Sequence, residues 1–288
     1  MISASLTDRL KADQLNPIEL VELIKRALAE DVANSDKTTL ATINQDQVST
    51  AKLISRNAGV LAGVTIAAAV FEISGISDIK FAKSCGDKIA PGETILTITG
   101  KTRAILSCER VALNLISHLS GIATLTSVWV EKIAGTNAVI RDTRKTTPGL
   151  RQLEKFAVRM GGGENHRMNL SDGAIIKDNH IAAAGSVTKA IESVRQEFPG
   201  TEIEVEVDTI DQLKEALITK VDIILLDNMS IEETKAAVEL TKGSQTRLES
   251  SGGLKLENAK AYASTGVDYL AVGALTHSAP VLDIGLDF

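Results

Sequence analysis

The stretch IEVEVDTIDQLKEALITKVDIILLDNM, residues 203–229, decides the fold class, because two short apolar runs flank an amphipathic segment. Residues 203–207 and 223–226 are rich in Val, Ile and Leu, which favour strands, and residues 211–218 have helical spacing. A strand, a helix and a second strand in this order are typical of parallel strands joined by a crossover helix. We therefore expect a parallel sheet covered by helices in this part of the chain.

The same alternation extends over the second half of the chain. Further apolar runs lie at residues 138–140, 174–176, 247–249 and 269–272. Helical patterns fall near residues 150–160, 187–198, 231–240 and 256–264, and Ser230 with Glu233 predicts a capping box for the third of these. Only 3% of the residues are aromatic, so the core must consist of Ala, Val, Ile and Leu, as in covered parallel sheets. These observations favour an α/β protein over a sandwich of antiparallel strands.

The first third of the chain has a different pattern. A helix is indicated at residues 18–29, and extended runs are indicated at 51–55 and on either side of the Gly- and Pro-containing segment 86–93. A long helical stretch then covers residues 109–133, with a break expected near Gly121. This part is typical of a small module that mixes helices and strands.

Each apolar run of the second half is followed by polar residues or glycine. In chain order these are Asp142 and Arg144, Lys177, Glu206 and Asp208, Asp227, residues 250–253, and Gly273. In a (β/α) barrel the carboxyl ends of the strands meet on one face, and that face carries the chemistry. We expect the functional site there.

Positive charge is concentrated between residues 141 and 180. This window has eight Lys and Arg residues and five acidic ones, so its net charge is 8 − 5 = +3, whereas the whole chain carries −6. A local cationic patch in an acidic chain suits a small polyanion better than a nucleic acid, which needs a broad basic surface. The alternative is a set of surface ion pairs with Glu154, Glu164 and Asp178.

Two further features indicate phosphate and metal or sugar chemistry. Segments 250–253 and 272–274 resemble the glycine-containing loops that bind phosphate after the last strands of barrels, although they would also serve as tight turns. Glu206 and Asp227 would repel an anion unless Mg²⁺ or a positively charged sugar centre lies between them. Both features favour bond breaking at the anomeric carbon of a phosphorylated sugar.

Cysteines and hydropathy limit the cellular context. Cys85 and Cys108 have neither a disulfide framework nor a zinc spacing, and we expect two partly buried thiols. His118 and His277 are expected to pack rather than to catalyse. No signal peptide is visible, and the longest uncharged apolar run, between Arg56 and Glu72, is too short for a bilayer. A cytoplasmic protein with no membrane and no nucleic-acid partner is the prediction.

Seven motifs carry a resemblance to a known family. They are ERVALNLISHLSGIAT (109–124), RDTRKTTPGLR (141–151), GGGENHR with IKDNH (161–167 and 176–180), EVEVDT (204–209), ILLDNM (224–229), LESSGG (248–253) and GVDYLAVGALTHS (266–278). In this order they resemble the quinolinate phosphoribosyltransferases, also called carboxylating nicotinate-nucleotide pyrophosphorylases. The first hundred residues resemble the family more loosely. The chain lacks the acidic-pair Thr-Gly loop of many other phosphoribosyltransferases, so the resemblance is to the barrel type.

The resemblance implies a fold, an activity and an assembly. It implies an N-terminal α/β sandwich, residues 1–115 with the tail 279–288 packed on it, and an incomplete (β/α) barrel, residues 116–278. The family transfers phosphoribose from phosphoribosyl pyrophosphate (PRPP) to quinolinate with Mg²⁺, releasing pyrophosphate and CO₂ and giving nicotinate mononucleotide for NAD biosynthesis. A homodimer, or a hexamer built as a trimer of dimers, is implied.

The resemblance also implies roles for individual residues. Arg144, His166, Arg167 and Lys177 would hold the two carboxylates of quinolinate, together with Arg110 contributed across the subunit interface. Lys145 would face the pyrophosphate, and Glu206 and Asp227 would serve the ribose and Mg²⁺; with Lys177 these are the catalytic candidates. Ser250, Ser251, Gly252, Val272 and Gly273 would bind the phosphate of PRPP. Two alternatives remain: a barrel transferase with another acceptor, such as nicotinate or a pterin- or molybdate-associated compound, and a barrel that binds phosphorylated metabolites as a sensor.

Overall fold

A computed structural model describes residues 2–31 and 35–288 of the chain. It contains two compact units, and each is formed by segments that are distant in sequence. The first unit comprises residues 1–127, 147–162 and 278–288, and the second comprises residues 128–146 and 163–277. The predicted boundary at residue 115 falls inside one long helix, α5 (Thr102–Lys132). The segment 147–162 groups with the first unit although it lies between two strands of the second.

The first unit is built on a four-stranded antiparallel sheet in the order β12-β1-β5-β3. Its strands are β1 (Val48–Ser55), β3 (Asp78–Phe81), β5 (Thr94–Lys101) and β12 (Ile284–Asp287), and a short pair is formed by β2 (Gly59–Val60) and β4 (Lys88–Ile89). Its helices include α1 (Ala4–Ala12), α2 (Pro17–Glu30), α3 (Lys37–Thr42), α4 (Val64–Ile73) and α6 (Arg151–Met160). The C-terminal strand β12 pairs with β1, so the tail completes this sheet.

The helix α5 corrects one expectation, because it runs through Gly121 without a break. The glycine is needed for packing instead: a Cβ at this position would lie 2.1 Å from the carbonyl oxygen of Pro280. By length and composition α5 could cross a bilayer, yet 56% of its most apolar window is buried within the structure. A core helix of a globular protein has these properties. The apolar run before Glu72 forms the buried helix α4.

The second unit contains the predicted parallel sheet. Its six strands are β6 (Val139–Arg141), β7 (Ala174–Ile176), β8 (Ile203–Val207), β9 (Ile223–Asp227), β10 (Arg247–Ser251) and β11 (Tyr269–Ala271). All six occur within two residues of the predicted positions. Their order in the sheet is β6-β11-β10-β9-β8-β7, and every neighbouring pair is parallel. The first and second strands of this unit therefore stand at opposite edges, as in a barrel that has not closed.

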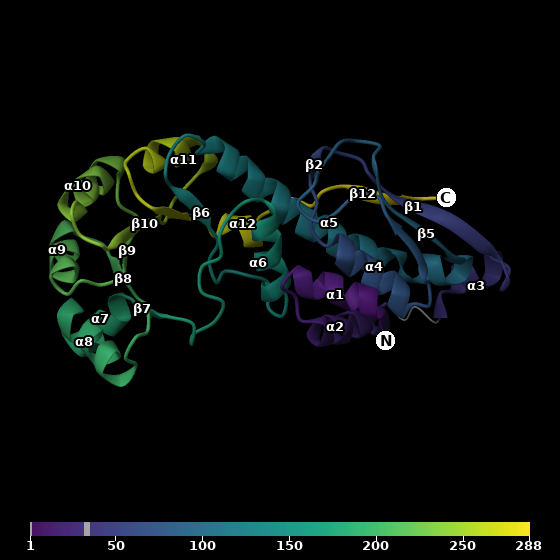
Figure 1. Ribbon diagram of the computed structural model, residues 1–288, viewed down its shortest axis with the longest axis horizontal. Helices are drawn as coiled ribbons and strands as arrows, with labels where there is room; N and C mark the ends of the chain where they lie inside the picture. The colour runs from purple at the N-terminus through teal and green to yellow at the C-terminus, as the bar shows by residue number, and fades with distance from the viewer. Residues whose placement is uncertain (1, 32–34) are drawn as a thin grey trace. The chain divides into compact units, whose positions relative to one another are not determined.

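The opening of this barrel lies between β6 and β7, which form no ladder in the described residues. The segment that follows α6 runs beside β6 instead: the N–H of Glu164 donates to Ile140 O (2.8 Å), and the N–H of Asp142 donates to Glu164 O (3.2 Å). Helices pack against the outside of the curved sheet (Figure 1): α8 (Val187–Glu197), α9 (Ile210–Ile218), α10 (Ile231–Thr241) and α11 (Leu256–Ala263). Two short helices of this unit were not predicted, α7 (Asp178–Ala184) and α12 (Ala274–His277). The α/β class, with an open barrel and a separate N-terminal module, is confirmed.

Candidate active site

The alternation of side chains along the parallel strands brings polar groups to one face of the second unit. In β8 the residues Ile203, Val205 and Val207 are buried on one face, so Glu204 and Glu206 share the other. The parallel register places Glu206 beside Leu225 of β9, and Asp227 of β9 beside Ser251 of β10. Polar residues at alternate positions of successive strands thus line the inner side of the sheet.

A cavity of about 350 Å³ lies at the carboxyl ends of these strands. Eight of the predicted site residues line it: Arg144, Lys145, His166, Arg167, Lys177, Glu206, Asp227 and Ser251. They come from the segments that follow β6 and α6 and from β7, β8, β9 and β10. The structure therefore brings together, in one unit, cations and carboxylates that are up to 83 residues apart in sequence.

The two arginines of the cavity lack partners for part of their hydrogen-bonding capacity. The Nε atoms of Arg144 and Arg167 are buried and have no hydrogen-bond partner in the described residues, although Arg167 donates from Nη1 to Gly173 O (2.7 Å). Burial lowers the pKa of Arg167, and the positive charge of Arg144 lowers it further. Two guanidinium groups that repel each other at the wall of a cavity, each with an unpartnered Nε–H donor, form a site for an anion.

The alternative of surface ion pairs finds no support for these cations. In the part of the chain that the structure describes, Glu154 accepts a hydrogen bond from His118 Nε2 (2.9 Å), and no ion pair joins Arg144, Lys145 or Arg167 to an acidic residue. Lys177 does have a partner, because its Nζ contacts Glu206 Oε2. His118 is thereby bound to Glu154 in the first unit and does not line the cavity.

The basic window is divided by the fold. Arg151, Lys155 and Arg159 lie on α6 and belong to the first unit, where Lys155 is fully buried. A Cβ on Gly161, which follows α6, would lie 2.3 Å from the carbonyl oxygen of Ala123, so this helix packs closely on α5. Only the ends of the window, Arg144 with Lys145 and Arg167 with Lys177, reach the cavity.

The acidic residue Asp227 is held by its neighbour. Asn228 adopts a left-handed backbone conformation, with φ of 53°, and its Nδ2 donates to Asp227 Oδ2 (2.7 Å). Its backbone N–H donates to Ser251 O (2.9 Å), which ties the ends of β9 and β10 together. A Cβ on Gly252 would lie 2.2 Å from Asn228 Oδ1, so glycine is required there for packing as well as for its φ of 81°.

Five predicted residues do not line the cavity. Ser250 and Val272 are buried, and Ser250 alternates with the cavity residue Ser251, so its side chain lies on the opposite face of β10. Gly252 and Gly273 adjoin the cavity only as backbone; a Cβ on Gly273 would lie 3.0 Å from Lys145 Cδ. Arg110 is exposed on α5 of the first unit. Their roles stay predictions.

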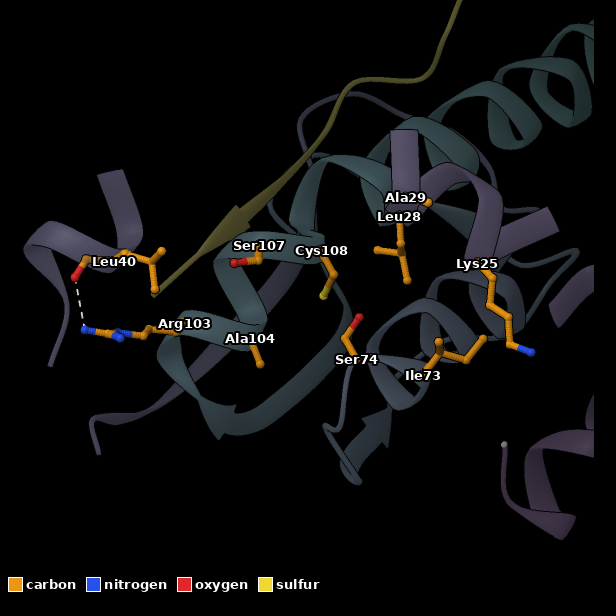
Figure 2. Close-up of a pocket in the computed structure, with 10 residues that line it drawn as sticks. All are labelled: Lys25, Leu28, Ala29, Leu40, Ile73, Ser74, Arg103, Ala104, Ser107 and Cys108. Carbon is orange, nitrogen blue, oxygen red and sulfur yellow. Dashed lines mark hydrogen bonds between the residues drawn. The ribbon is translucent and has the colours of Figure 1, made fainter. Parts of the chain in front are cut away.

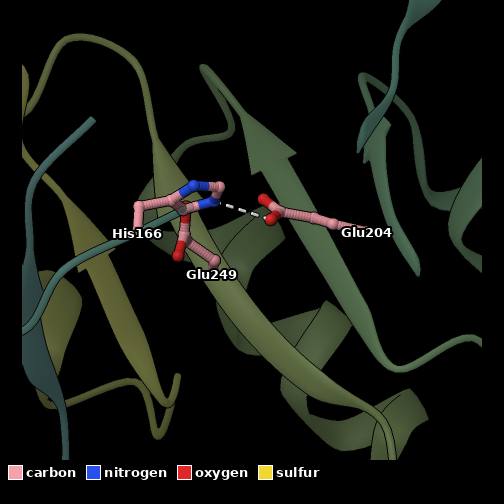
Figure 3. A group of neighbouring side chains, drawn as sticks. All are labelled: His166, Glu204 and Glu249. Atoms are coloured by element: carbon pink, nitrogen blue, oxygen red, sulfur yellow. Dashed lines mark hydrogen bonds and ion pairs between the residues drawn. The ribbon is translucent and has the colours of Figure 1, made fainter. Parts of the chain in front are cut away.

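Three charged residues near the cavity were not singled out in the sequence. We call Arg141, His166, Glu204 and Glu249 the buried cluster; Figure 3 shows the last three. His166 Nε2 lies 2.7 Å from Glu204 Oε2 and 3.8 Å from Glu249 Oε1, and Arg141 Nη1 lies 2.9 Å from Glu249 Oε2. Burial, and then the charge of Glu204, raise the pKa of Glu249 to about 7. The alternation of β8 could have identified Glu204, because it shares a face with Glu206.

A second cavity lies in the first unit and offers no comparable chemistry. It has a volume of about 470 Å³ and is lined by apolar side chains together with Lys25, Arg103 and Cys108 (Figure 2). Arg103 is engaged with the carbonyl oxygens of Leu40 and Ile43. Burial raises the pKa of the Cys108 thiol to about 11, which makes it a poor nucleophile at neutral pH. Cys85 and Cys108 are both free thiols, as predicted.

Comparison with known proteins gives one consistent result. Residues 36–120 match the family model "Quinolinate phosphoribosyl transferase, N-terminal domain", and residues 122–287 match the model of the C-terminal domain. The carboxylating nicotinate-nucleotide pyrophosphorylase of Mycobacterium leprae is 49% identical over 92% of this chain and 96% of its own length. NadC from Streptococcus pyogenes has a crystal structure that matches with a TM-score of 0.91 and 42% identity, covering 95% of this chain and 97% of that one. Nicotinate-nucleotide pyrophosphorylase from Ehrlichia chaffeensis matches with a TM-score of 0.87 and 41% identity, covering 92% and 97%.

Proposed function

Because the chain belongs to the quinolinate phosphoribosyltransferase family, we propose that it transfers phosphoribose from PRPP to the ring nitrogen of quinolinate. Loss of CO₂ and pyrophosphate then gives nicotinate mononucleotide, a precursor of NAD. The observation that supports this most directly is a single cavity that combines Arg144, Arg167 and Lys177 with Glu206 and Asp227. The enzyme class follows from the family, and the assignment of individual residues is our proposal.

The cations of the cavity suit a dicarboxylate. Quinolinate carries two adjacent carboxylates, and more than one cation is needed to neutralise them. Arg144 and Arg167 provide planar guanidinium groups with free buried Nε–H donors, which can bind a carboxylate through two parallel hydrogen bonds. Nicotinate has a single carboxylate and would leave part of this set unsatisfied, so the geometry favours quinolinate as the acceptor.

Lys177 links the two substrates. Its ammonium group contacts Glu206. An acceptor carboxylate would compete for the same ammonium and would release Glu206 to interact with the ribose. The side chain of Lys145 lies over Gly273, where the missing Cβ leaves space, and we assign it to the pyrophosphate group.

Glu206 and Asp227 fit the requirements of Mg²⁺, because carboxylate oxygens together with substrate phosphates are its usual ligands in proteins. They lie at the ends of neighbouring parallel strands and both line the cavity. When bound there, Mg²⁺ would neutralise the charge that develops on the departing pyrophosphate. Asn228 donates to Oδ2 of Asp227 and thereby orients this carboxylate. The same carboxylates would stabilise positive charge on the anomeric carbon of the ribose.

Decarboxylation requires little from the protein. Once the ring nitrogen carries the ribose it is positively charged. This charge stabilises the electron pair that stays on the adjacent ring carbon when CO₂ leaves, and a proton from water then forms the new C–H bond at that carbon. The cavity residues therefore need to bind and orient the acceptor so that its nitrogen faces the ribose, and orientation of this kind supplies much of the rate. No base is assigned to this step.

Assembly and location are further parts of the proposal. We assign Arg110 to the quinolinate site of a neighbouring subunit in a homodimer or a trimer of dimers, and we place the enzyme in the cytoplasm. The exposed position of Arg110 on α5 supports a role toward a partner. Mixing an Arg110→Ala chain with an Arg167→Ala chain tests this, because mixed dimers would contain one complete site. Refolding equal amounts together should restore about a quarter of wild-type activity, since half of the dimers are mixed and each has one intact site.

One assay tests the activity. The protein is incubated with Mg²⁺, PRPP and quinolinate, and nicotinate mononucleotide, pyrophosphate and CO₂ are quantified. Equal amounts of the three products are expected, with no product in the presence of EDTA. A parallel reaction with nicotinate in place of quinolinate tests the alternative acceptor. If PRPP binds but is not consumed with either acceptor, the protein is a sensor instead.

A further inference from the structure

The buried cluster lies directly beside the cavity, and its side chains bind one another. His166 and Glu249 also line the cavity, although Glu249 has no exposed surface and His166 has 8%. Arg141 stacks on Tyr269, with the guanidinium carbon 4.3 Å from the ring centre, and pairs with Glu249. These contacts hold Arg141, at the end of β6, against Glu249 of β10 and Tyr269 of β11.

The cluster has the composition of a metal site, because one ligand atom from each of His166, Glu204 and Glu249 falls within 4.8 Å of the others. The hydrogen bonds of the imidazole argue against this use. Nδ1 of His166 accepts from the backbone N–H of Arg167 (2.8 Å), so Nδ1 carries no proton. The neutral ring therefore has its proton on Nε2, and this nitrogen donates to Glu204 Oε2 (2.7 Å) and has no lone pair for a metal. The guanidinium of Arg141 beside Glu249 further disfavours a cation.

The same bonds connect Glu204 to the arginine that faces the acceptor. Glu204 selects the Nε2–H form of His166, and this form leaves Nδ1 free to accept from the N–H of Arg167. The other ring form would place two protons face to face, one on Nδ1 and one on the Arg167 nitrogen. The guanidinium of Arg167 is then held by Gly173 O, with Nε unsatisfied and buried. One chain of contacts thus runs from a buried carboxylate to a donor in the cavity.

We propose that Glu204 is a positioning residue for acceptor binding, which acts through the Nε2–H form of His166 on the backbone and guanidinium of Arg167. The inference rests on the proposed function, in which Arg167 binds a carboxylate of quinolinate. His166 contributes orientation and a wall of the cavity, not a positive charge. In this proposal Glu204 does not contact a substrate, because it is 4% exposed, does not line the cavity and bonds to the Nε2 edge of the His166 ring.

The first test is a measurement on the unaltered enzyme. Long-range ¹H–¹⁵N correlation spectra of protein labelled with ¹⁵N-histidine distinguish protonated from unprotonated ring nitrogens, and the resonances of His166 are assigned by comparison with a His166→Asn sample. We expect Nδ1 unprotonated and Nε2 protonated. A proton on Nδ1 of His166 would overturn the proposal whether or not any variant folds.

The second test is kinetic and uses three variants. Glu204→Ala removes the acceptor for Nε2–H, Glu204→Gln keeps an acceptor oxygen of the same size, and Glu202→Gln makes the same change two residues away on the surface. We expect Glu204→Ala to raise the KM for quinolinate by about 10- to 100-fold, the range seen when supporting hydrogen bonds of site residues are lost. The KM for PRPP should change less than about twofold, Glu204→Gln should recover most of the loss, and Glu202→Gln should match the wild type.

The outcomes separate the inference from the activity on which it rests. If wild-type protein does not convert quinolinate, the proposed function fails first. If wild-type protein is active and a folded Glu204→Ala enzyme keeps its KM for quinolinate, or loses affinity for both substrates equally, the positioning role is wrong. If Glu204→Ala does not fold, Glu204→Gln and the spectrum of His166 decide: a Gln variant as impaired for PRPP as for quinolinate contradicts the proposal.

Discussion

The inner face of the parallel sheet carries charged residues in two regions that differ in how the charges are satisfied. At the cavity, Arg144 and Arg167 retain buried donors with no partner in the described residues. Neither arginine has an ion-pair partner there. One step deeper, the members of the buried cluster pair with one another at 2.7–2.9 Å, although Arg141 Nε, Glu204 Oε1 and Glu249 Oε1 also lack a hydrogen-bond partner in the described residues. A cation with no internal counter-charge is available to an anionic ligand, whereas charges that pair with one another hold a shape. The difference separates residues that bind from residues that position.

The line of glutamates on β8 shows this difference within one strand. Glu202, immediately before β8, and Glu204 and Glu206 within it occupy alternate positions and so share a face, at the surface, in the buried cluster and in the cavity respectively. Their partners are Arg247, His166 and Lys177. Glutamate thus forms a surface ion pair, supports a histidine or lines the cavity, according to its position along the strand.

The largest effect is expected from removal of a cavity donor. Arg167→Ala should lower kcat/KM for quinolinate by about 2–4 kcal/mol of transition-state binding, because a buried charge-assisted hydrogen bond is lost. Steady-state kinetics with quinolinate varied at saturating PRPP measure this loss. Arg195→Ala is the matched control, because Arg195 is exposed and donates only to the carbonyl oxygens of Thr219 and Lys220. A loss below about 1 kcal/mol would be that of a surface pair and would remove Arg167 from the acceptor site.

The buried cluster should instead govern stability, in a manner that depends on pH. The pKa of Glu249 is about 7 in the folded chain, raised from its ordinary value of 4.5, so the folded state binds a proton more tightly than the unfolded state. Its stabilising contribution is complete below pH 4.5 and is lost as the pH rises toward 7. The loss is on the order of 3 kcal/mol at most, from a shift of about two to three pH units.

Glu249→Gln should abolish most of this pH dependence, because glutamine remains neutral and can still accept from Arg141. Urea unfolding at intervals between pH 5 and 8 measures the slope for both proteins. Asp46→Asn is the control: hydrogen bonding to Lys101 lowers the pKa of Asp46, which completes its ionisation below this range. Equal slopes for wild type and Glu249→Gln would show that Glu249 is ionised throughout this pH range and that folding does not raise its pKa.

Asn228 offers an intermediate effect, because it supports a carboxylate of the cavity. It donates to Asp227 and is itself held by Ser251 and Gly252. Asn228→Ala should weaken Mg²⁺ activation by about 10- to 100-fold, as expected for loss of a hydrogen bond to a metal ligand. The measurement is initial rate against free Mg²⁺ at fixed PRPP. An unchanged Mg²⁺ dependence, with a normal melting temperature, would mean that Asp227 does not contact the metal or does not need this support.

The sequence predicted the six strands of the second unit, their parallel arrangement and the polar residues at their carboxyl ends, because apolar runs and the residues after them are local signals. Several features depend on contacts between distant segments and had no such signal. Gly121 looked like a helix break, but its missing Cβ accommodates Pro280, 159 residues later. Glu249 precedes a glycine loop, and only the fold brings it to His166. Glu204 was accessible in principle, since the period of two in IEVEV places it with Glu206 on one face.

The smallest effect is expected at the surface end of β8, and it sets the scale for the others. Glu202 pairs with Arg247, and both side chains are about half exposed. Glu202→Gln should reduce the free energy of unfolding by about 0.2–1 kcal/mol, and by less in ~1 M salt, where exposed charges are screened. Urea unfolding at low and high salt measures this, with Glu204→Ala as the buried comparison on the same face. If the two substitutions had equal effects on stability and on the KM for quinolinate, depth along β8 would not distinguish surface, positioning and binding carboxylates. If each carboxylate acts through its own partner, Glu202→Gln changes only the free energy of unfolding and leaves the kinetics unaltered.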